Sequence, residues 1–162
     1  MAQVDYFIKI EGVDGESTDD KHKKEIDVES FSWGETNTGT AGHGSGSGAG
    51  KVRPQDFTFT KRIDKSSPVL FIGCALGTHY KEATFTARKA GGGQQEYLKI
   101  KLEGVLVSSY QTTGASGSDG TVHETVALNF AKLHIIYKEQ KGDGTLGGEA
   151  KQGYDFEANK KL

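Results

Sequence analysis

Alternation of apolar and polar residues is the main pattern along this chain, and it predicts a protein built mostly from β-strands. In the segment 57–63, Phe57, Phe59 and Ile63 fall on one side of an extended chain, and threonine and arginine side chains fall on the other. A period of two is typical of a half-buried strand. The same alternation occurs in three further segments, 4–10, 80–89 and 96–110.

One apolar segment departs from this alternation and predicts a single short helix. Ser66 or Ser67 suits the N-cap, Pro68 suits the first helical position, and Gly77 suits the left-handed residue just past the end. The segment is apolar nearly all round, so we expect it to be covered on more than one side. Cys74, the only cysteine, lies inside it and is predicted to be a small core residue without a disulfide partner.

In three places the apolar positions change from one face of a predicted strand to the other, which indicates β-bulges. The changes lie between Val28 and Phe31, at Gly104, and between Phe130 and Leu133. The last two fall within predicted strands of about 16 residues, which are long. Such strands either turn a corner between two sheets, or bury both faces because a neighbouring subunit covers the outer one. After residue 140 we expect a glycine-rich loop over 141–153 and a short strand near residues 154–156.

Length, net charge and the distribution of apolar residues argue against several classes of function and location. A chain of 162 residues is predicted to form one domain, 1–162. The formal net charge of −2, with mixed signs, argues against a nucleic-acid partner. Acidic residues within the first 16 positions argue against a secretory signal, so we expect a cytoplasmic fold without Sec export. No apolar run approaches the ~20 residues that cross a bilayer, so no membrane insertion is expected.

Two segments rich in glycine and serine, about 37–51 and 112–121, are predicted to be flexible loops. A long structureless loop in a compact domain is uncommon and often contacts something. Each segment is therefore either a solvated excursion of a hairpin or a binding element.

Motifs for catalysis or cofactor binding fail on inspection. Gly50 and Lys51 resemble the end of a phosphate-binding loop, but Ser45 and Val52 stand where glycine and Ser or Thr are required. The glycines of 142–147 match a dinucleotide motif without the helix that must follow. The five histidines have no metal-ligand spacing and are predicted to be surface or partly buried polar residues: His22, His43, His79, His123 and His134. We predict no catalytic, metal or cofactor site and no enzymatic activity.

The chain resembles the Hcp family, the haemolysin-coregulated tube proteins of type VI secretion systems. The resemblance covers nearly the whole chain. It is densest in FTKRIDKSSP (59–68), ARKAGG (87–92), EYLKIKL (96–102) and VSSY (107–110), and loosest in the two Gly/Ser segments and after Lys141. The combination of these segments is far more specific than any one of them.

This resemblance implies an all-β fold, a compact β-barrel of two antiparallel sheets with one short α-helix packed against it. It also implies homohexameric rings that stack into the inner tube of the secretion machine. Such a protein is cytoplasmic when assembled, is secreted to the medium or a target cell, and carries small effector proteins in the ring lumen. Its further partners are sheath and spike or baseplate components.

Candidate site residues follow from the resemblance and from strand parity. Ser32 lies between Phe31 and Trp33, so it points away from the face that they bury. Its position in the family's Trp-containing strand implies a lumen residue that contacts effectors, although an ordinary exposed serine fits the parity equally well. Glycine lets backbones approach closely. The candidate ring-stacking residues are therefore in two loops that act with the C-terminal residues: Gly44, Gly46, Gly48, Lys51, Gly91 and Gly92.

Three functions from different classes remain open at this point. A structural tube protein that carries effectors is favoured. A β-sandwich binding module, for instance for sugars, would use the Gly/Ser loops as its binding edge and would be a monomer or dimer. A hydrolase would need a catalytic triad assembled from residues far apart in the sequence, and no serine can be nominated for it.

Overall fold

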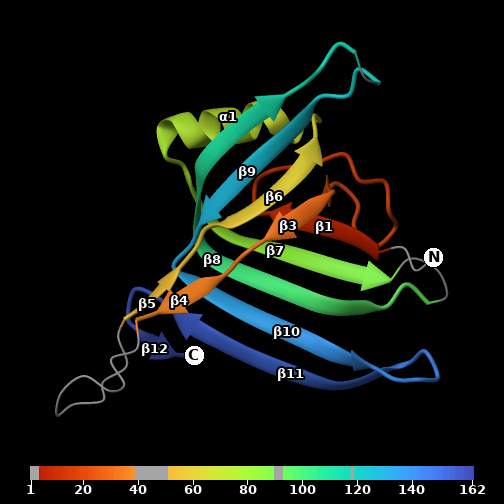
Figure 1. The fold of residues 1–162 in the computed structure, drawn as a ribbon, viewed down its shortest axis with the longest axis vertical. Coiled ribbons are helices and arrows are strands. Elements are labelled where there is room, and N and C mark those ends of the chain that lie inside the picture. Colours follow the sequence, from red (N-terminus) through yellow and green to blue (C-terminus); the bar gives the residue numbers. More distant parts are fainter. Residues whose placement is uncertain (1–3, 39–50, 90–92, 118) are drawn as a thin grey trace.

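The computed structural model describes residues 4–38, 51–89, 93–117 and 119–162 (Figure 1). Within them the chain is mostly antiparallel strand, with one helix, α1 (Ser66–Leu76). The predicted all-β class with one short helix is confirmed. The strands are β1 (Val4–Ile10), β2 (Ile26–Val28), β3 (Ser30–Ser32), β4 (Glu35–Asn37), β5 (Val52–Pro54), β6 (Phe57–Arg62), β7 (His79–Lys89), β8 (Glu96–Thr113), β9 (His123–Asn129), β10 (Lys132–Gln140), β11 (Leu146–Asp155) and β12 (Lys160–Lys161).

The strands form two runs of pairings that share one strand, and no pairing among the described strands closes them into the predicted barrel. One run of pairings follows the order β12-β11-β10-β8-β7-β1-β2, and a second joins β3 to β6, β6 to β9 and β9 to β8. The long strand β8 belongs to both runs, because its residues 98–103 pair with β10 and its residues 106–113 pair with β9. We call β3, β6, β9 and residues 106–113 of β8 the four-stranded sheet. The short ribbon β4–β5 pairs separately.

The predicted changes of strand phase fall where the chain passes from one run of paired strands to the other. Between β2 and β3 the chain passes Glu29 and exchanges β1 for β6 as its partner. In β8 the change occurs at Gly104, which has a φ of 65°. At the third position the prediction of one long strand was wrong, since the chain bends at Phe130 and Ala131 and separates β9 from β10. The Ala131 N–H donates to the Glu103 carbonyl at 2.9 Å, which joins the two corners.

The corner at Gly104 requires glycine for two reasons. Its φ is in the left-handed region, and a Cβ there would lie 3.0 Å from the Cβ of Ala131. We therefore expect Gly104→Ala to lower the free energy of unfolding by about 1–3 kcal/mol. Gly148→Ala is the matched control in a strand, since a Cβ at residue 148 meets nothing within 4 Å. Chemical unfolding of both variants checks this, and equal stabilities would contradict it.

The core lies between the four-stranded sheet and the strands β1, β7 and β8. An aromatic cluster fills its centre, with the Phe85 ring 5.5 Å from Phe57 and 4.3 Å from Phe31 between centroids. Phe57, Phe59 and Phe85 are fully buried. The apolar residues of the alternating segments are therefore the ones that the fold buries, as their period of two predicts.

The start of α1 differs from the prediction. The N-cap is Lys65, and neither serine caps the helix. Instead, the Ser66 N–H donates to Oδ1 of Asp64 at 2.8 Å, so a carboxylate before the cap takes the role predicted for a serine hydroxyl. Pro68 lies at the third helical position rather than the first. At the other end Gly77 has a φ of 65°, which confirms the predicted C-terminal glycine.

The described residues cover α1 on one side only, whereas its apolar composition predicts cover on more than one side. The helix packs against β8 and buries Ser66, Ser67, Leu70 and Gly73. Phe71 remains 58% exposed and Leu76 73% exposed. Cys74 is a free cysteine that is half-buried and packs against the core, so its prediction as a small core residue is confirmed in part. The helix lies beside β8, and no other described element covers its outer side (Figure 1).

The C-terminal segment also differs from the prediction. Strand β11 pairs with β10 in a register that runs from Lys132 opposite Asp155 to Gln140 opposite Leu146. Most of the predicted glycine-rich loop is therefore strand. Only residues 141–145 form the connection. Glycines within β11 weaken the local strand pattern, and the long pairing with β10 supplies the missing stabilisation. The second predicted loop begins later than expected, because residues 112 and 113 belong to β8.

The polar connection between β1 and β2 is anchored by buried charge. Arg88 is buried and forms ion pairs with Asp5 and Asp19, and its guanidinium lies 4.8 Å from the ring centroid of Phe7. The Phe7 ring also stacks on the ring of His22, with 4.3 Å between the two centroids. His22 is itself buried, and its ring nitrogens lie 2.8 Å from Glu25 and 2.7 Å from Glu96. It is more enclosed than the surface or partly buried residue that the sequence predicts.

Asp19 makes this anchor sensitive to acid. The hydrogen bond from Arg88 lowers the pKa of Asp19 from 3.8 to about 2. A lowered pKa in the folded state stabilises the fold above the ordinary pKa, and this stabilisation is lost as the pH falls through 3.8 towards 2. We expect Asp19→Asn to be less stable than the parent at neutral pH, and the difference to shrink over that window. Urea unfolding across pH measures this; a constant difference would contradict it.

Candidate functional surface

The outward face of the four-stranded sheet carries small polar side chains in register. One row across the strands consists of Ser32, Thr58, Ala127 and Ser109. The next row consists of Ser30, Thr60, Thr125 and Gln111. All of these side chains are exposed or half-buried. We call these two rows the polar face.

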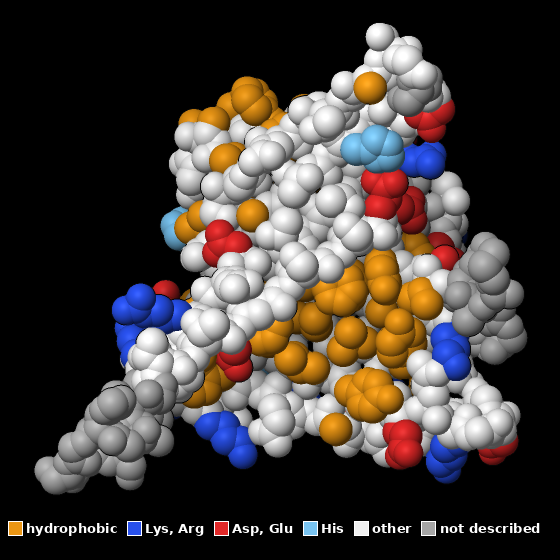
Figure 2. Space-filling model, in the orientation of Figure 1, with side chains coloured by type: hydrophobic (Ala, Val, Ile, Leu, Met, Phe, Trp, Pro, Cys, Tyr) orange, Lys and Arg blue, Asp and Glu red, His pale blue; other side chains and the backbone are white. Residues whose placement is uncertain are grey.

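Strand alternation produces the polar face directly. In β6 and β9 the residues between the polar positions are Phe57, Phe59, Val126 and Leu128, and all four are buried in the core. Because successive side chains of a strand point to opposite sides, the serines and threonines are left on the outside. Figure 2 shows the surface over the middle of β6 and β9 as mostly white, that is, without hydrophobic or charged side chains.

Charges border the polar face at both of its ends. At one end Asp56 accepts hydrogen bonds from Oγ of Ser108 at 2.6 Å and from Nδ2 of Asn129 at 3.1 Å. The other end is the third row. There Arg62 pairs with His123 across the strands, and Nδ1 of His123 lies 2.8 Å from Oε1 of Glu29. Within the two rows, the hydroxyls of Ser30 and Thr60 are hydrogen bonded at 2.6 Å. The polar face therefore offers hydroxyl and amide groups without fixed charge. Such a surface can form many weak hydrogen bonds.

The predicted candidates are distributed over different regions. Ser32 lies on the polar face and is exposed, in agreement with its parity. Its neighbours Thr58, Thr60, Thr125 and Gln111 were not predicted. They could have been found by the same rule, because each lies opposite in parity to apolar residues already assigned to the core. Five candidate stacking residues lie outside the described residues: Gly44, Gly46, Gly48, Gly91 and Gly92.

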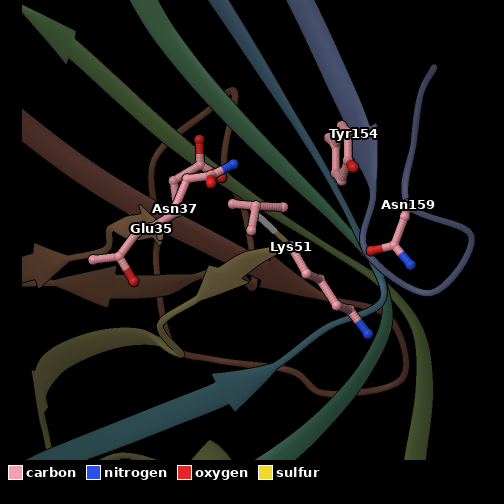
Figure 3. A pocket seen from close by; sticks show the side chains of 7 residues that line it. Glu35, Asn37, Lys51, Tyr154 and Asn159 are labelled. Atoms are coloured by element: carbon pink, nitrogen blue, oxygen red, sulfur yellow. The ribbon is translucent and has the colours of Figure 1, made fainter. Parts of the chain in front are cut away.

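Lys51, the remaining candidate, borders a hollow of about 740 Å³ between the β4–β5 ribbon and the C-terminal strands. Glu35, Asn37, Tyr154 and Asn159 also line it. Figure 3 shows the Lys51 side chain extending towards the Asn159 side of this hollow. The structure thus places a predicted stacking residue next to the C-terminal residue Asn159. The β4–β5 ribbon that bears it lies at the end of the molecule away from the end of β7 and the start of β8 (Figure 1).

Within residues 4–38, 51–89, 93–117 and 119–162, no group of three or more His, Cys, Asp or Glu side chains is placed to hold a metal ion. No helix in the same residues has the length and apolar character needed to cross a bilayer.

Comparison with known proteins identifies the relatives of this chain. The family model described as "Type VI secretion system effector, Hcp" matches residues 7–137. Protein hcp1 of Pseudomonas aeruginosa is 54% identical over 158 residues, which cover 96% of this chain and 97% of that protein. The crystal structure of Hcp1 from Salmonella typhimurium is 37% identical, covers both chains fully and has a TM-score of 0.81. A solved type six secretion system protein, 33% identical, has a TM-score of 0.93 and covers 99% of this chain and all of its own.

Proposed function

The chain belongs to the Hcp family of type VI secretion system proteins, and on that premise we propose that it is a tube-building subunit whose polar face lines a lumen. Six copies close into a ring, rings stack into a tube, and the lumen carries small effector proteins. The tube is fired from the cell with its cargo and works with sheath and spike or baseplate components. The protein acts as a structural element and carrier and performs no catalysis.

The composition of the polar face is the observation that carries this proposal. A lumen through which proteins pass needs a wall that is wetted and free of large apolar side chains, because an apolar wall would bind unfolded or exposed hydrophobic segments. Two registered rows of serine, threonine, alanine and glutamine meet that need. Hydroxyl groups give weak, adaptable hydrogen bonds, which hold cargo reversibly.

The two margins of the four-stranded sheet support ring formation. Among the described strands, β3 pairs only with β6, and the segment of β8 after Leu106 pairs only with β9. Each margin therefore presents backbone N–H and C=O groups without a neighbouring strand. Open sheet edges are sites where another chain adds. The two edges are different surfaces of the chain, so a contact between them joins copies head-to-tail. Such a contact generates a ring when the rotation from one copy to the next adds up to a full turn.

Stacking would use the two ends of the molecule that lie along the strands. Lys51 and Asn159 lie at one end, whereas β7 ends and β8 begins at the other (Figure 1). Because the two ends are different, each ring can stack on the next in the same orientation without limit, as a tube requires. On this basis we propose a stacking role for Lys51. For Gly44, Gly46, Gly48, Gly91 and Gly92, which lie outside the described residues, the same role is proposed from the sequence alone.

Light scattering on the purified chain tests the assembly. We expect a particle with six times the 17.4 kDa mass of the chain, or a multiple of that particle. A protein that stays monomeric over a wide concentration range contradicts the proposal, and a stable dimer favours a binding module instead.

Ser32→Gln tests the lumen assignment. The longer amide side chain projects from the polar face and obstructs cargo, so we expect several-fold less effector to copurify while the particle mass stays unchanged. Thr84→Gln is the matched control. Thr84 lies on β7, away from the polar face, in a surface hollow with Lys9 and Glu82. Equal effector yields from the two variants would show that Ser32 does not face the cargo.

A further inference from the structure

The connection between β1 and β2, residues 11–25, contains a buried histidine whose two ring nitrogens both face carboxylates. Nδ1 of His22 lies 2.8 Å from Oε2 of Glu25, and Nε2 lies 2.7 Å from Oε1 of Glu96. The ring is stacked on Phe7, and the residue is 5% exposed. Both contacts are therefore shielded from water, and the protein itself has to satisfy both nitrogens.

A neutral imidazole ring does not satisfy this arrangement. It donates one N–H and offers a lone pair at the other nitrogen, whereas an ionised carboxylate only accepts. One of the two short contacts would then hold a lone pair against a carboxylate oxygen. An imidazolium ring donates at both nitrogens and forms two charge-assisted hydrogen bonds. The geometry therefore requires one proton more than the neutral ring carries.

The neighbours of the ring place this proton on the imidazole. Burial raises the pKa of Glu96, but hydrogen bonds from His22 and Lys99 lower it, and the net pKa lies below the ordinary value. Glu96 is therefore an ionised acceptor at neutral pH. Between His22 and Glu25, the imidazole is by its chemistry the stronger base. The ring thus holds the proton and donates it to both carboxylates.

Carboxylates outnumber cations around this cluster. The charged groups on the elements packed around it are Asp19 and Glu25 of the connection, Asp5 of β1, Arg88 of β7, Glu96 and Lys99 of β8, Lys138 of β10 and Glu149 of β11. The charged neighbours of the histidine in sequence are exposed, so solvent screens them: Asp20, Lys21, Lys23 and Lys24. An excess of negative charge close to an imidazole favours its charged form.

We propose that the doubly protonated ring of His22 clamps the β1–β2 connection to the start of β8, and that loss of its proton opens this clamp. Without the proton the ring donates to one carboxylate only, and the other contact becomes repulsive. The connection then keeps its tie to β7, through Asp19 and Arg88, and loses its tie to Glu96. This inference concerns the single chain and does not depend on the proposed assembly.

The two ties of the connection respond to pH in opposite directions. The hydrogen bond from Arg88 lowers the pKa of Asp19 to about 2, so the tie to β7 is lost only in acid. The tie through His22 needs a bound proton, so it is present where an ordinary imidazole is protonated and is lost as the pH rises. The connection is therefore held at both ties over a limited range of pH, and its β8 side opens at the alkaline end.

Amide hydrogen exchange of the full chain, followed by mass spectrometry from about pH 6 to about pH 9, tests the clamp. The N–H groups of Gly15, Ser17 and Lys24 report on it, because they donate to backbone carbonyls within the connection. His22→Gln is the reference, since glutamine gains no proton in this range. We expect these amides to exchange about tenfold faster in His22→Gln than in the parent near pH 6, and the difference to disappear towards pH 9.

Glu96→Gln separates the bound proton from the contact itself. The new amide group donates to a neutral imidazole, so the tie to β8 persists without the additional proton. We expect near-parental exchange at pH 6 and a several-fold smaller response to rising pH. His79→Gln is the matched control for the loss of a histidine, because His79 is exposed at the start of β7. It should follow the parent at every pH.

Each other result overturns the proposal. A difference between His22→Gln and the parent that stays constant with pH would show that His22 acts through packing alone. Equal exchange in these two proteins at every pH would show that His22 does not hold the connection. A pH response in Glu96→Gln as large as that of the parent would place the proton on Glu25. A response that His79→Gln abolishes equally would show a general effect of pH on the fold.

Discussion

Lys61→Met is expected to lower the free energy of unfolding by about 3–5 kcal/mol, because it leaves a buried carboxylate without its cation. Lys61 and Glu124 are both fully buried, and the Lys61 Nζ lies 2.7 Å from Oε1 of Glu124. The same ammonium group donates to Oδ1 of Asp64 and to Oγ of Ser67, each at 3.0 Å. After the substitution, Glu124 keeps only hydroxyl donors, from Ser67 and Thr112.

The double variant Lys61→Met/Glu124→Leu separates the cost of a lone charge from the cost of altered packing. Replacing both members of a buried ion pair with apolar residues of similar volume is often neutral or stabilising. We therefore expect the double variant to recover most of the stability that Lys61→Met loses. Urea unfolding of the two variants and the parent measures this, and a double variant as unstable as the single one would show that packing around Lys61 decides the loss.

Phe85→Ala is expected to cost about 3–5 kcal/mol, since it removes the ring at the centre of the aromatic cluster and leaves a cavity. Phe85 is fully buried, and its ring lies within 5.5 Å of the rings of Tyr6, Phe31 and Phe57. These residues come from β1, β3 and β6, so the cavity would loosen the contact between the two runs of strands.

Phe85→Leu is the matched control, because leucine fills much of the volume that alanine leaves empty and should cost markedly less. Thermal and chemical unfolding at one protein concentration compares the two variants, because assembly makes apparent stability depend on concentration. Similar losses for leucine and alanine would indicate that ring contacts, and not the filled volume, hold this part of the core.

Much of the fold could be predicted because each element depends on residues that are close together in the chain. The alternation around Phe57 and Phe59 places their side chains in the core, and the same parity places Ser32 on the outside. The change of phase at Gly104 marks a corner that the structure contains. For a strand, neighbouring side chains point to opposite faces whatever the partner strands are. The local pattern of residues is therefore sufficient to predict the side of the strand on which each side chain lies.

The candidate site was predictable only in part. The parity of Ser32 was correct, and the same rule extends to Thr58 and Thr60. The rows themselves depend on pairings such as Thr60 with Thr125, which join residues far apart in sequence. Register between distant strands is set by packing of the whole core and by turn geometry. For that reason the sequence identified one polar position, Ser32, whereas the structure has the two rows of the polar face.

Two errors have a common physical cause. Strand β11 was missed because its glycines weaken local propensity, and only its pairing with β10 makes it a strand. The cap of α1 was misplaced because Asp64, held by Lys61, is positioned better than either serine to accept the first free N–H. In both cases a tertiary contact overrides a local preference.

By itself, the sequence determined the strand-forming segments, the single helix, the corners and the sides on which side chains lie, because these follow from periods of two and 3.6 residues along the chain. Only the tertiary structure decided which strands pair, that Lys61 meets Glu124, and that the described residues leave the apolar side of α1 exposed. Those outcomes depend on distant segments competing for one core. An apolar helix looks the same in sequence whether its own chain covers it or another copy does.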